Sequence, residues 1–241
     1  MRWSNVRALL LCCVLAGSSA APEQQLTSSP KPQASPTKST AEAPRRAPEF
    51  FVMIDPSHGG YDKGADFGGK LLEKDITLKL GRELKRELDE RGIPCRMLRD
   101  SDMDITLDRR AEIANEQHAG IYIALHAGKL GRGVRVYASL LAEQQAAGQF
   151  VPWESAQSTA LEHSKAIAQA VAGELKKKEI PVATLGIPLR PLNNVAAPAI
   201  AIELSPEGDL QSLENSKRHG MVAAAVASAI AQLRERTGAH P

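Results

Sequence analysis

From residue 51 onward, short apolar runs alternate with longer segments in which apolar residues recur at helical spacing. Four leucines between positions 78 and 88 are spaced for one face of a helix, which we expect over residues 75–91 with Gly92 as its end. Apolar runs of strand length predict the sheet. The pattern predicts strands at 51–54, 94–98, 120–125, 134–138 and 199–204, and further helices at 106–118, 155–178 and 214–234.

Strands separated by helices of this length are typical of an α/β fold, in which helices cover a largely parallel sheet. We therefore expect a single domain built on a mostly parallel, twisted sheet of about six strands, with helices on both faces. In sheets of this kind the active site lies at the carboxyl ends of the strands, where the loops leave a crevice.

Two segments precede this domain. Residues 1–20 begin with Arg2 and Arg7, continue with an apolar run over 8–16 and end in the small residues at 18–20. This order is typical of a cleaved secretory signal, and the apolar run is shorter than the roughly 20 residues that span a bilayer. We therefore predict export to the periplasm or the medium, without stable membrane insertion after cleavage; an uncleaved anchor is the alternative.

Residues 21–48 are rich in Pro, Ser, Thr, Gln and Ala and show no apolar periodicity. Such a composition cannot bury enough apolar surface to offset the entropy of ordering, so we predict a flexible linker. The domain then covers residues 49–238.

Composition narrows the choice of partners. Hydrophobic residues make up 43% and charged residues 24% of the 241-residue chain, as in ordinary globular proteins. The net charge of +2 is too small to indicate nucleic acid as a partner. Removal of the signal leaves only Cys95, so we expect no internal disulfide, and its place in a predicted strand favours a buried packing role over a reactive thiol.

Potential metal ligands follow the predicted strands. His58 lies in the loop after the first strand, while His126 and Glu203 directly end two others; Glu73 precedes the first long helix. Two imidazoles and a carboxylate with an open fourth position are typical of catalytic zinc, and a further carboxylate can serve as general base. Spacing alone does not exclude the alternative that these four residues have no common function and are a loop histidine, a core histidine and two surface carboxylates. We predict surface positions for the remaining histidines of the domain: His118, His163, His219 and His240.

The motifs decide between these interpretations. The run IDPSHGGYDKGA at 54–65 resembles the opening motif of the zinc-dependent N-acetylmuramoyl-L-alanine amidases of bacterial cell walls. Further segments match that family in order along residues 51–233: Glu73-Lys74-Asp75, Leu98 to Asp102, Thr106-Leu107 with Arg110 and Ala114-Asn115, Leu125-His126-Ala127, and Pro198 to Leu204.

The resemblance implies Zn²⁺ as cofactor, with His58, Glu73 and His126 as its ligands. It implies Glu203 as the catalytic base that acts on zinc-activated water. The implied substrate is peptidoglycan, cleaved at the amide between the lactyl group of N-acetylmuramic acid and L-alanine of the stem peptide. A protein activator is a further candidate partner, and we expect a monomer. Asp55 either orients a ligand imidazole or caps the loop.

Three positions depart from the family pattern. Ser57 stands where glycine is usual, Gly128 where asparagine is common, and residues 205–208 replace the usual loop after the catalytic glutamate. The altered loop at 205–208 keeps one alternative open, a non-catalytic peptidoglycan-binding module of the same fold. Similar site chemistry on related sheets keeps a second one open, a zinc exopeptidase. Residues 140–154 fall where some family members carry an occluding helix; this short stretch favours an ordinary loop or groove wall.

Overall fold

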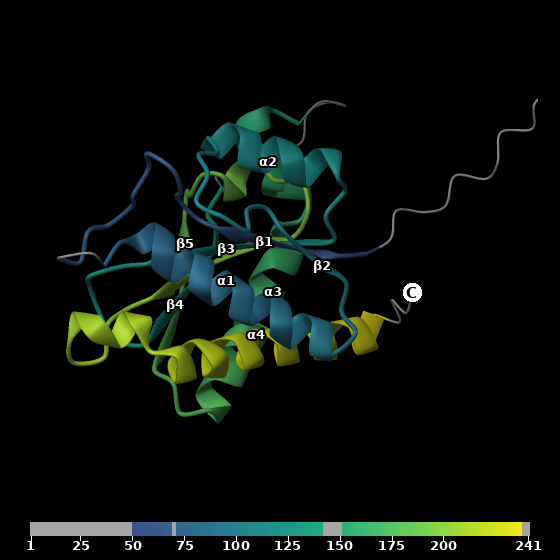
Figure 1. The fold of residues 1–241 in the computed structure, drawn as a ribbon. Coiled ribbons are helices and arrows are strands. Elements are labelled where there is room, and N and C mark those ends of the chain that lie inside the picture. The colour runs from purple at the N-terminus through teal and green to yellow at the C-terminus, as the bar shows by residue number, and fades with distance from the viewer. Residues whose placement is uncertain (1–49, 69–70, 142–150, 238–241) are drawn as a thin grey trace, which may run out of the picture. The chain divides into compact units, whose positions relative to one another are not determined.

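A six-stranded sheet forms the centre of the computed structural model, which describes residues 50–68, 71–141 and 151–237 (Figure 1). Its strand order is β2-β1-β3-β6-β4-β5. The strands are β1 (Val52–Pro56), β2 (Cys95–Met97), β3 (Ile121–Ala127), β4 (Val134–Ser139), β5 (Val182–Ile187) and β6 (Ala199–Leu204). The described residues do not include the predicted signal (1–20), the predicted linker (21–48) or residues 142–150 of the predicted loop. These assignments stay predictions.

The prediction of a mostly parallel sheet is confirmed. Strands β2, β1, β3 and β6 are mutually parallel, so their carboxyl ends lie at one edge of the sheet. Strand β4 runs antiparallel to β6, and β5 lies parallel to β4 at the sheet's edge. Strand β5 was not predicted from the sequence, because an edge strand buries few side chains and its residues lack the apolar run that marks the central strands.

Helices cover both faces, as predicted. Figure 1 shows α1 (Glu73–Glu90) and α4 (Ser216–Thr237) side by side across one face, with α3 (Leu161–Lys177) on the same side and α2 (Leu107–Glu116) opposite. The sheet has a hydrophobic core on each face, and side chains alternate between them along β1. Val52 and Ile54 belong to the core on the side of α1, α3 and α4, and Met53 belongs to the core on the side of α2. None of the helices in the described ranges is long and apolar enough to span a membrane.

The helix predicted over 155–178 is two elements, a 3₁₀ segment at Trp153–Thr159 followed by α3. The Gln157 side chain explains the break, since it is buried and donates hydrogen bonds of 2.7 Å to the carbonyls of Val195 and Ala197. The helix predicted over 214–234 likewise begins as a 3₁₀ turn at Leu210–Glu214 before α4. Helical periodicity does not detect such tertiary contacts.

Two burial predictions were wrong. His219 is 2% exposed, and its Nε2 donates to the carbonyl of Leu213 at 2.7 Å, because the first turn of α4 packs this residue inward, towards the 3₁₀ turn that precedes the helix. Cys95 is only half-buried, because β2 is an edge strand. His118 and His163 are exposed as predicted, and His240 lies outside the described residues.

Candidate metal centre

The loop after β1 carries His58 in an unusual backbone conformation. His58 has a φ of 65° and Gly59 a φ of 133°, both in the region that L side chains rarely adopt. Two buried arginines stabilise this path. Arg99 donates through Nε to the carbonyl of Pro56 at 2.7 Å, and Arg110 donates through Nη2 to the carbonyl of His58 at 2.7 Å. The loop carbonyls therefore have charged donors although they are shielded from water.

A second set of contacts fixes the next turn of the same loop. Lys74 donates to the carbonyl of Gly60 at 3.0 Å and to the Asp102 carboxylate at 2.6 Å. The same carboxylate accepts the Gly60 N–H at 2.7 Å. Lys74 and Asp102, which are far apart in sequence, thus hold one glycine turn near His58.

The other two predicted ligands come from regular elements. Glu73 is the first residue of α1 rather than a residue ahead of it, and a helix N-terminus favours a carboxylate. His126 lies near the end of β3, where it is paired in register with Glu203 of β6.

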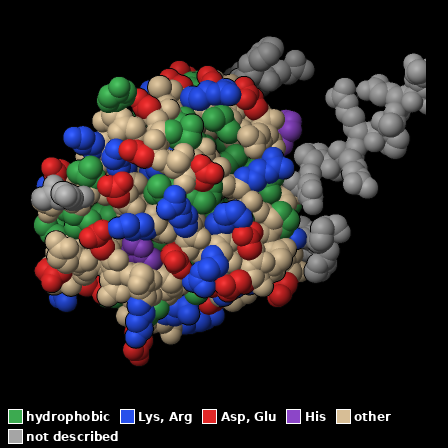
Figure 2. Space-filling view, in the orientation of Figure 1, with side chains coloured by type: hydrophobic (Ala, Val, Ile, Leu, Met, Phe, Trp, Pro, Cys, Tyr) green, Lys and Arg blue, Asp and Glu red, His purple; other side chains and the backbone are tan. Residues whose placement is uncertain are grey.

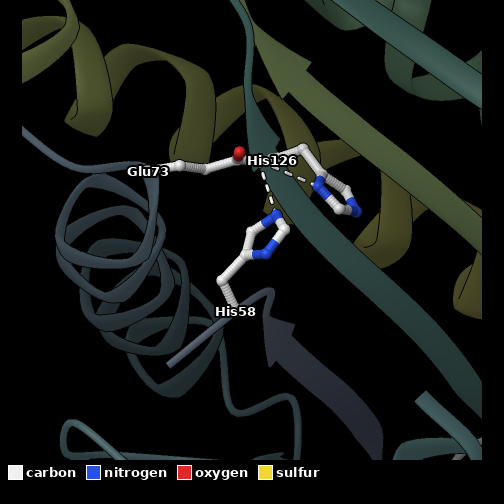
Figure 3. A group of neighbouring side chains, drawn as sticks. All are labelled: His58, Glu73 and His126. Atoms are coloured by element: carbon white, nitrogen blue, oxygen red, sulfur yellow. Dashed lines mark hydrogen bonds and ion pairs between the residues drawn. The ribbon is translucent and has the colours of Figure 1, made fainter. Parts of the chain in front are cut away.

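The structure brings the three predicted ligands together. Glu73 Oε1 lies 3.2 Å from His58 Nε2 and 3.0 Å from His126 Nδ1. One ligand atom from each residue falls within 4.8 Å of the others, and Figure 3 shows the carboxylate and both rings converging from three elements. Ligand atoms on a tetrahedral zinc are roughly 3.4 Å apart, given Zn–N and Zn–O distances of about 2.1 Å. The donor set therefore fits zinc.

Neighbouring side chains select which atom each ligand presents. Asp62 Oδ2 accepts from His58 Nδ1 at 2.8 Å, which leaves Nε2 facing Glu73. Ser57 Oγ lies 2.9 Å from His126 Nε2, which leaves Nδ1 facing Glu73. The Ala65 N–H binds Glu73 Oε2 at 2.8 Å, so Oε1 points into the centre. Such outer contacts fix the tautomer and orientation of metal ligands.

Asp55 has neither of its two predicted roles. Its buried carboxylate accepts hydrogen bonds from the Arg110 guanidinium and the Tyr122 hydroxyl, on the face of the sheet that α2 covers. A buried carboxylate needs such partners, and here it anchors the arginine that supports the His58 carbonyl. Burial raises the pKa of Tyr122, and the Asp55 charge adds to that rise, so the hydroxyl stays a donor.

The electrostatics of the centre favour a cation. Burial acts to raise the pKa of Glu73, but the hydrogen bonds from His126 and His58 outweigh it and hold the pKa well below its usual range. Burial acts to lower the pKa of His58, and the contacts with Glu73 and Asp62 outweigh it and raise that pKa. The carboxylate is therefore ionised, and its charge attracts whatever cation, proton or metal, sits between the rings.

Glu203 lies beside this cluster but binds other groups. Its carboxylate, 17% exposed, pairs with the Arg135 guanidinium and accepts the Tyr137 hydroxyl hydrogen bond at 2.6 Å. Arg135 is aligned with Glu203 across β4 and β6, as His126 is across β3 and β6. His126, Glu203 and Arg135 therefore form one row across three neighbouring strands.

Comparison with known proteins identifies the family. The family described as N-acetylmuramoyl-L-alanine amidase matches residues 52–232, well over half of the chain. This protein is a member of that amidase family. It is 37% identical over 90 residues to the germination-specific N-acetylmuramoyl-L-alanine amidase of Bacillus subtilis and 33% identical over 113 residues to N-acetylmuramoyl-L-alanine amidase AmiC of Neisseria meningitidis. These matches cover 32% and 44% of this chain but only 38% and 27% of those relatives.

Solved structures of the family share the fold. The N-acetylmuramoyl-L-alanine amidase of Clostridium difficile 630 superposes with a TM-score of 0.63 at 23% identity, over 78% of this chain and 98% of that one. AmiC2 of Nostoc punctiforme gives a TM-score of 0.62 at 24% identity, over 79% and 99%. These likenesses establish the amidase α/β fold for the described domain.

Four residues that shape the candidate metal centre were not predicted from the sequence. Ser57 and Asp62 lie inside the recognised motif, yet only the folded loop shows which imidazole each contacts. Arg135 and Tyr137 carry a detectable signal, since polar side chains at every second residue of an otherwise apolar strand lie on one face. That face is the one on which His126 and Glu203 lie.

Proposed function

We propose that this protein is a zinc-dependent N-acetylmuramoyl-L-alanine amidase. It hydrolyses the amide between the lactyl group of N-acetylmuramic acid and L-alanine of the stem peptide. The observation that carries the proposal is the convergence of His58, Glu73 and His126 within 4.8 Å, in a chain of this family.

His58 Nε2, Glu73 Oε1 and His126 Nδ1 would hold the metal. Bound zinc supplies a Lewis acid that polarises the scissile carbonyl and makes water more acidic. Asp62 and Ser57 keep both rings in the ligating tautomer, and the Ala65 N–H keeps the carboxylate monodentate. A donor set of three protein ligands leaves a position for water or substrate, as in catalytic zinc sites.

Glu203 is the proposed general base. Its carboxylate takes a proton from the attacking water as the new C–O bond forms, then delivers it to the amide nitrogen as the C–N bond breaks. A carboxylate offers about four lone-pair positions. Arg135 engages one on Oε1, and the Tyr137 hydroxyl and Arg135 Nε (at 3.4 Å) engage Oε2. The remaining position on Oε1 can accept the proton, so the observed contacts are compatible with base catalysis.

The substrate determines where the enzyme works. Peptidoglycan lies outside the cytoplasmic membrane, which agrees with export by the predicted signal at 1–20 and with a linker at 21–48 that gives the 49–238 domain reach. We propose that the enzyme acts there as a monomer. A CwlD amidase of the same fold has been solved in complex with the GerS lipoprotein, which supports a protein activator as a second partner to test.

The test is digestion of isolated peptidoglycan with the purified full chain, with and without zinc. We expect release of stem peptides with a free L-alanine amino group, loss of this release after chelation, and a fall in rate of about 10²- to 10⁴-fold for Glu203→Gln. Glu207→Gln is the matched control, because Glu207 is a nearby carboxylate that pairs with Arg218 rather than facing the centre.

Two outcomes would replace the proposal. Zinc binding without release of amines would identify a peptidoglycan-binding module. Cleavage only within the stem peptide would identify a zinc peptidase.

A further inference from the structure

Glu203, the proposed general base, lies between the predicted metal ligands on one side and an arginine on the other. His126 is its neighbour in register on β3, and Arg135 is its neighbour in register on β4. Paired residues on adjacent strands lie roughly 5 Å apart, with side chains on the same face. A Glu203 carboxylate could therefore extend towards the metal ligands or away from them, and the structure shows it paired with Arg135.

The loop between β3 and β4 leaves space for this second orientation. A Cβ added at Gly128 would lie 1.7 Å from Glu203 Oε1 and 3.0 Å from Arg135 Nη2. A Cβ added at Gly131 would lie 2.8 Å from Arg135 Nη1. The carboxylate thus occupies the volume that any side chain at 128 would need, and the guanidinium occupies the volume beside Gly131. Gly128, which departs from the family pattern, therefore leaves the space in which Glu203 pairs with Arg135.

Two hydrogen-bond donors from β4 hold the Glu203 carboxylate in this orientation. Arg135 donates to Oε1, its Nε lies 3.4 Å from Oε2, and the Tyr137 hydroxyl donates to Oε2 at 2.6 Å. The planar guanidinium and the hydroxyl engage both oxygens, so they define the carboxylate plane, which a lysine's point charge would not do.

We propose that Arg135 is a positioning residue that holds Glu203 apart from the metal ligands. The arginine keeps the carboxylate available to water and prevents it from becoming a fourth protein ligand. Four protein ligands would close the site, as in structural zinc centres, and would leave no position for water. This proposal rests on the proposed function, since it assigns Arg135 an effect that acts through Glu203.

The first test is a double-mutant cycle on the purified full chain. We expect Arg135→Gln to lower kcat by about 10- to 100-fold, the cost of a misplaced catalytic group, with KM nearly unchanged. In the Glu203→Gln background the same change should have no further effect, because residues that act as one unit are non-additive. Arg135→Lys should recover part of the loss, and Tyr137→Phe should give a smaller one.

The second test is zinc affinity, measured by competition with a chelator. If Glu203 swings to the metal when Arg135 is lost, Arg135→Gln should bind zinc at least as tightly as the wild type while kcat falls. Gly128→Ala should also lower kcat, because its Cβ displaces the carboxylate, whereas Gly173→Ala, which has no neighbour within 4 Å of its added Cβ, should not.

Three results would overturn the positioning role. These are an equal loss of kcat from Arg135→Gln with and without Glu203, a rise in KM at constant kcat, and a parallel fall of zinc affinity and kcat. Failure of the proposed function looks different, because the wild type would then release no amine from peptidoglycan, or Glu203→Gln alone would leave kcat unchanged.

Discussion

Ser57 Oγ lies 2.9 Å from His126 Nε2, on the ring nitrogen that does not face Glu73. Ser57 is itself buried, and it stands where the family usually has glycine. The departure therefore adds an outer contact to a ligand imidazole. Asp62 provides the equivalent contact to His58 at 2.8 Å.

Removal of either outer contact should weaken the metal centre without removing a ligand. We expect Ser57→Ala and Asp62→Ala each to lower zinc affinity by about 10- to 100-fold, because the imidazole loses its preferred tautomer and orientation. Competition with a chelator measures the change. Asp66→Ala is the control, since Asp66 lies in the same loop and caps only the N–H of Gly68; equal losses in all three variants would contradict this role.

Gly64 should be irreplaceable for a steric reason. Its φ is +64°, and an added Cβ would lie 2.7 Å from both Glu73 Oε2 and His58 Cδ2. Gly64→Ala should therefore displace two ligands and abolish tight zinc binding. Gly92→Ala is a matched control, because Gly92 has the same φ of +64° but no neighbour within 4 Å of its added Cβ. Metal analysis of both purified variants separates crowding from backbone strain, and similar zinc contents would refute the steric explanation.

The buried pair between Arg110 and Asp55 should be needed for folding. Their side chains are 3% and 0% exposed, so Arg110→Met leaves a buried carboxylate without its charged partner. We expect a loss of about 3–5 kcal/mol in the free energy of unfolding, measured by urea denaturation of zinc-free protein. The double variant Asp55→Leu/Arg110→Met should recover part of this loss in unfolding free energy. Arg109→Ala, which removes exposed ion pairs with Glu112 and Glu116 on the same helix, should change stability little; a comparable loss there would argue against the buried pair.

His219 should make stability depend on pH independently of the metal. Burial lowers the pKa of His219, and the nearby Arg218 and Lys79 charges act in the same direction. In the unfolded chain its pKa is about 6.5, so the unfolded state takes up a proton first as the pH falls. The stability linked to neutral His219 is thus complete above that value and is lost as the pH falls towards the folded pKa.

The test compares unfolding from about pH 8 to about pH 5 for the wild type, His219→Gln and His163→Gln. His219→Gln should flatten the pH dependence, because it removes the titrating group. His163 is exposed, so its replacement should leave the slope unchanged. Parallel slopes for the wild type and His219→Gln would contradict the assignment.

Much of the fold was predictable because helices and central strands bury periodic faces. The four leucines of α1 lie at a helical repeat, and the apolar runs of β1, β3 and β6 are buried strands of a parallel sheet. Edge strand β5 and the 3₁₀ segments were not predictable, since they depend on a neighbouring strand and on the Gln157 contacts. The inward orientation of His219 was missed for the same reason.

The sequence by itself determined the α/β class, the family and the identity of the metal-ligand candidates, because these follow from local periodicity and from motifs of fixed spacing. Only the tertiary structure decided which atoms converge. It turned His58 Nε2 and His126 Nδ1 towards Glu73 through contacts with Asp62 and Ser57, and it placed Glu203 against Arg135. Strand register and loop folding set these distances, and both arise from packing between residues far apart in the chain.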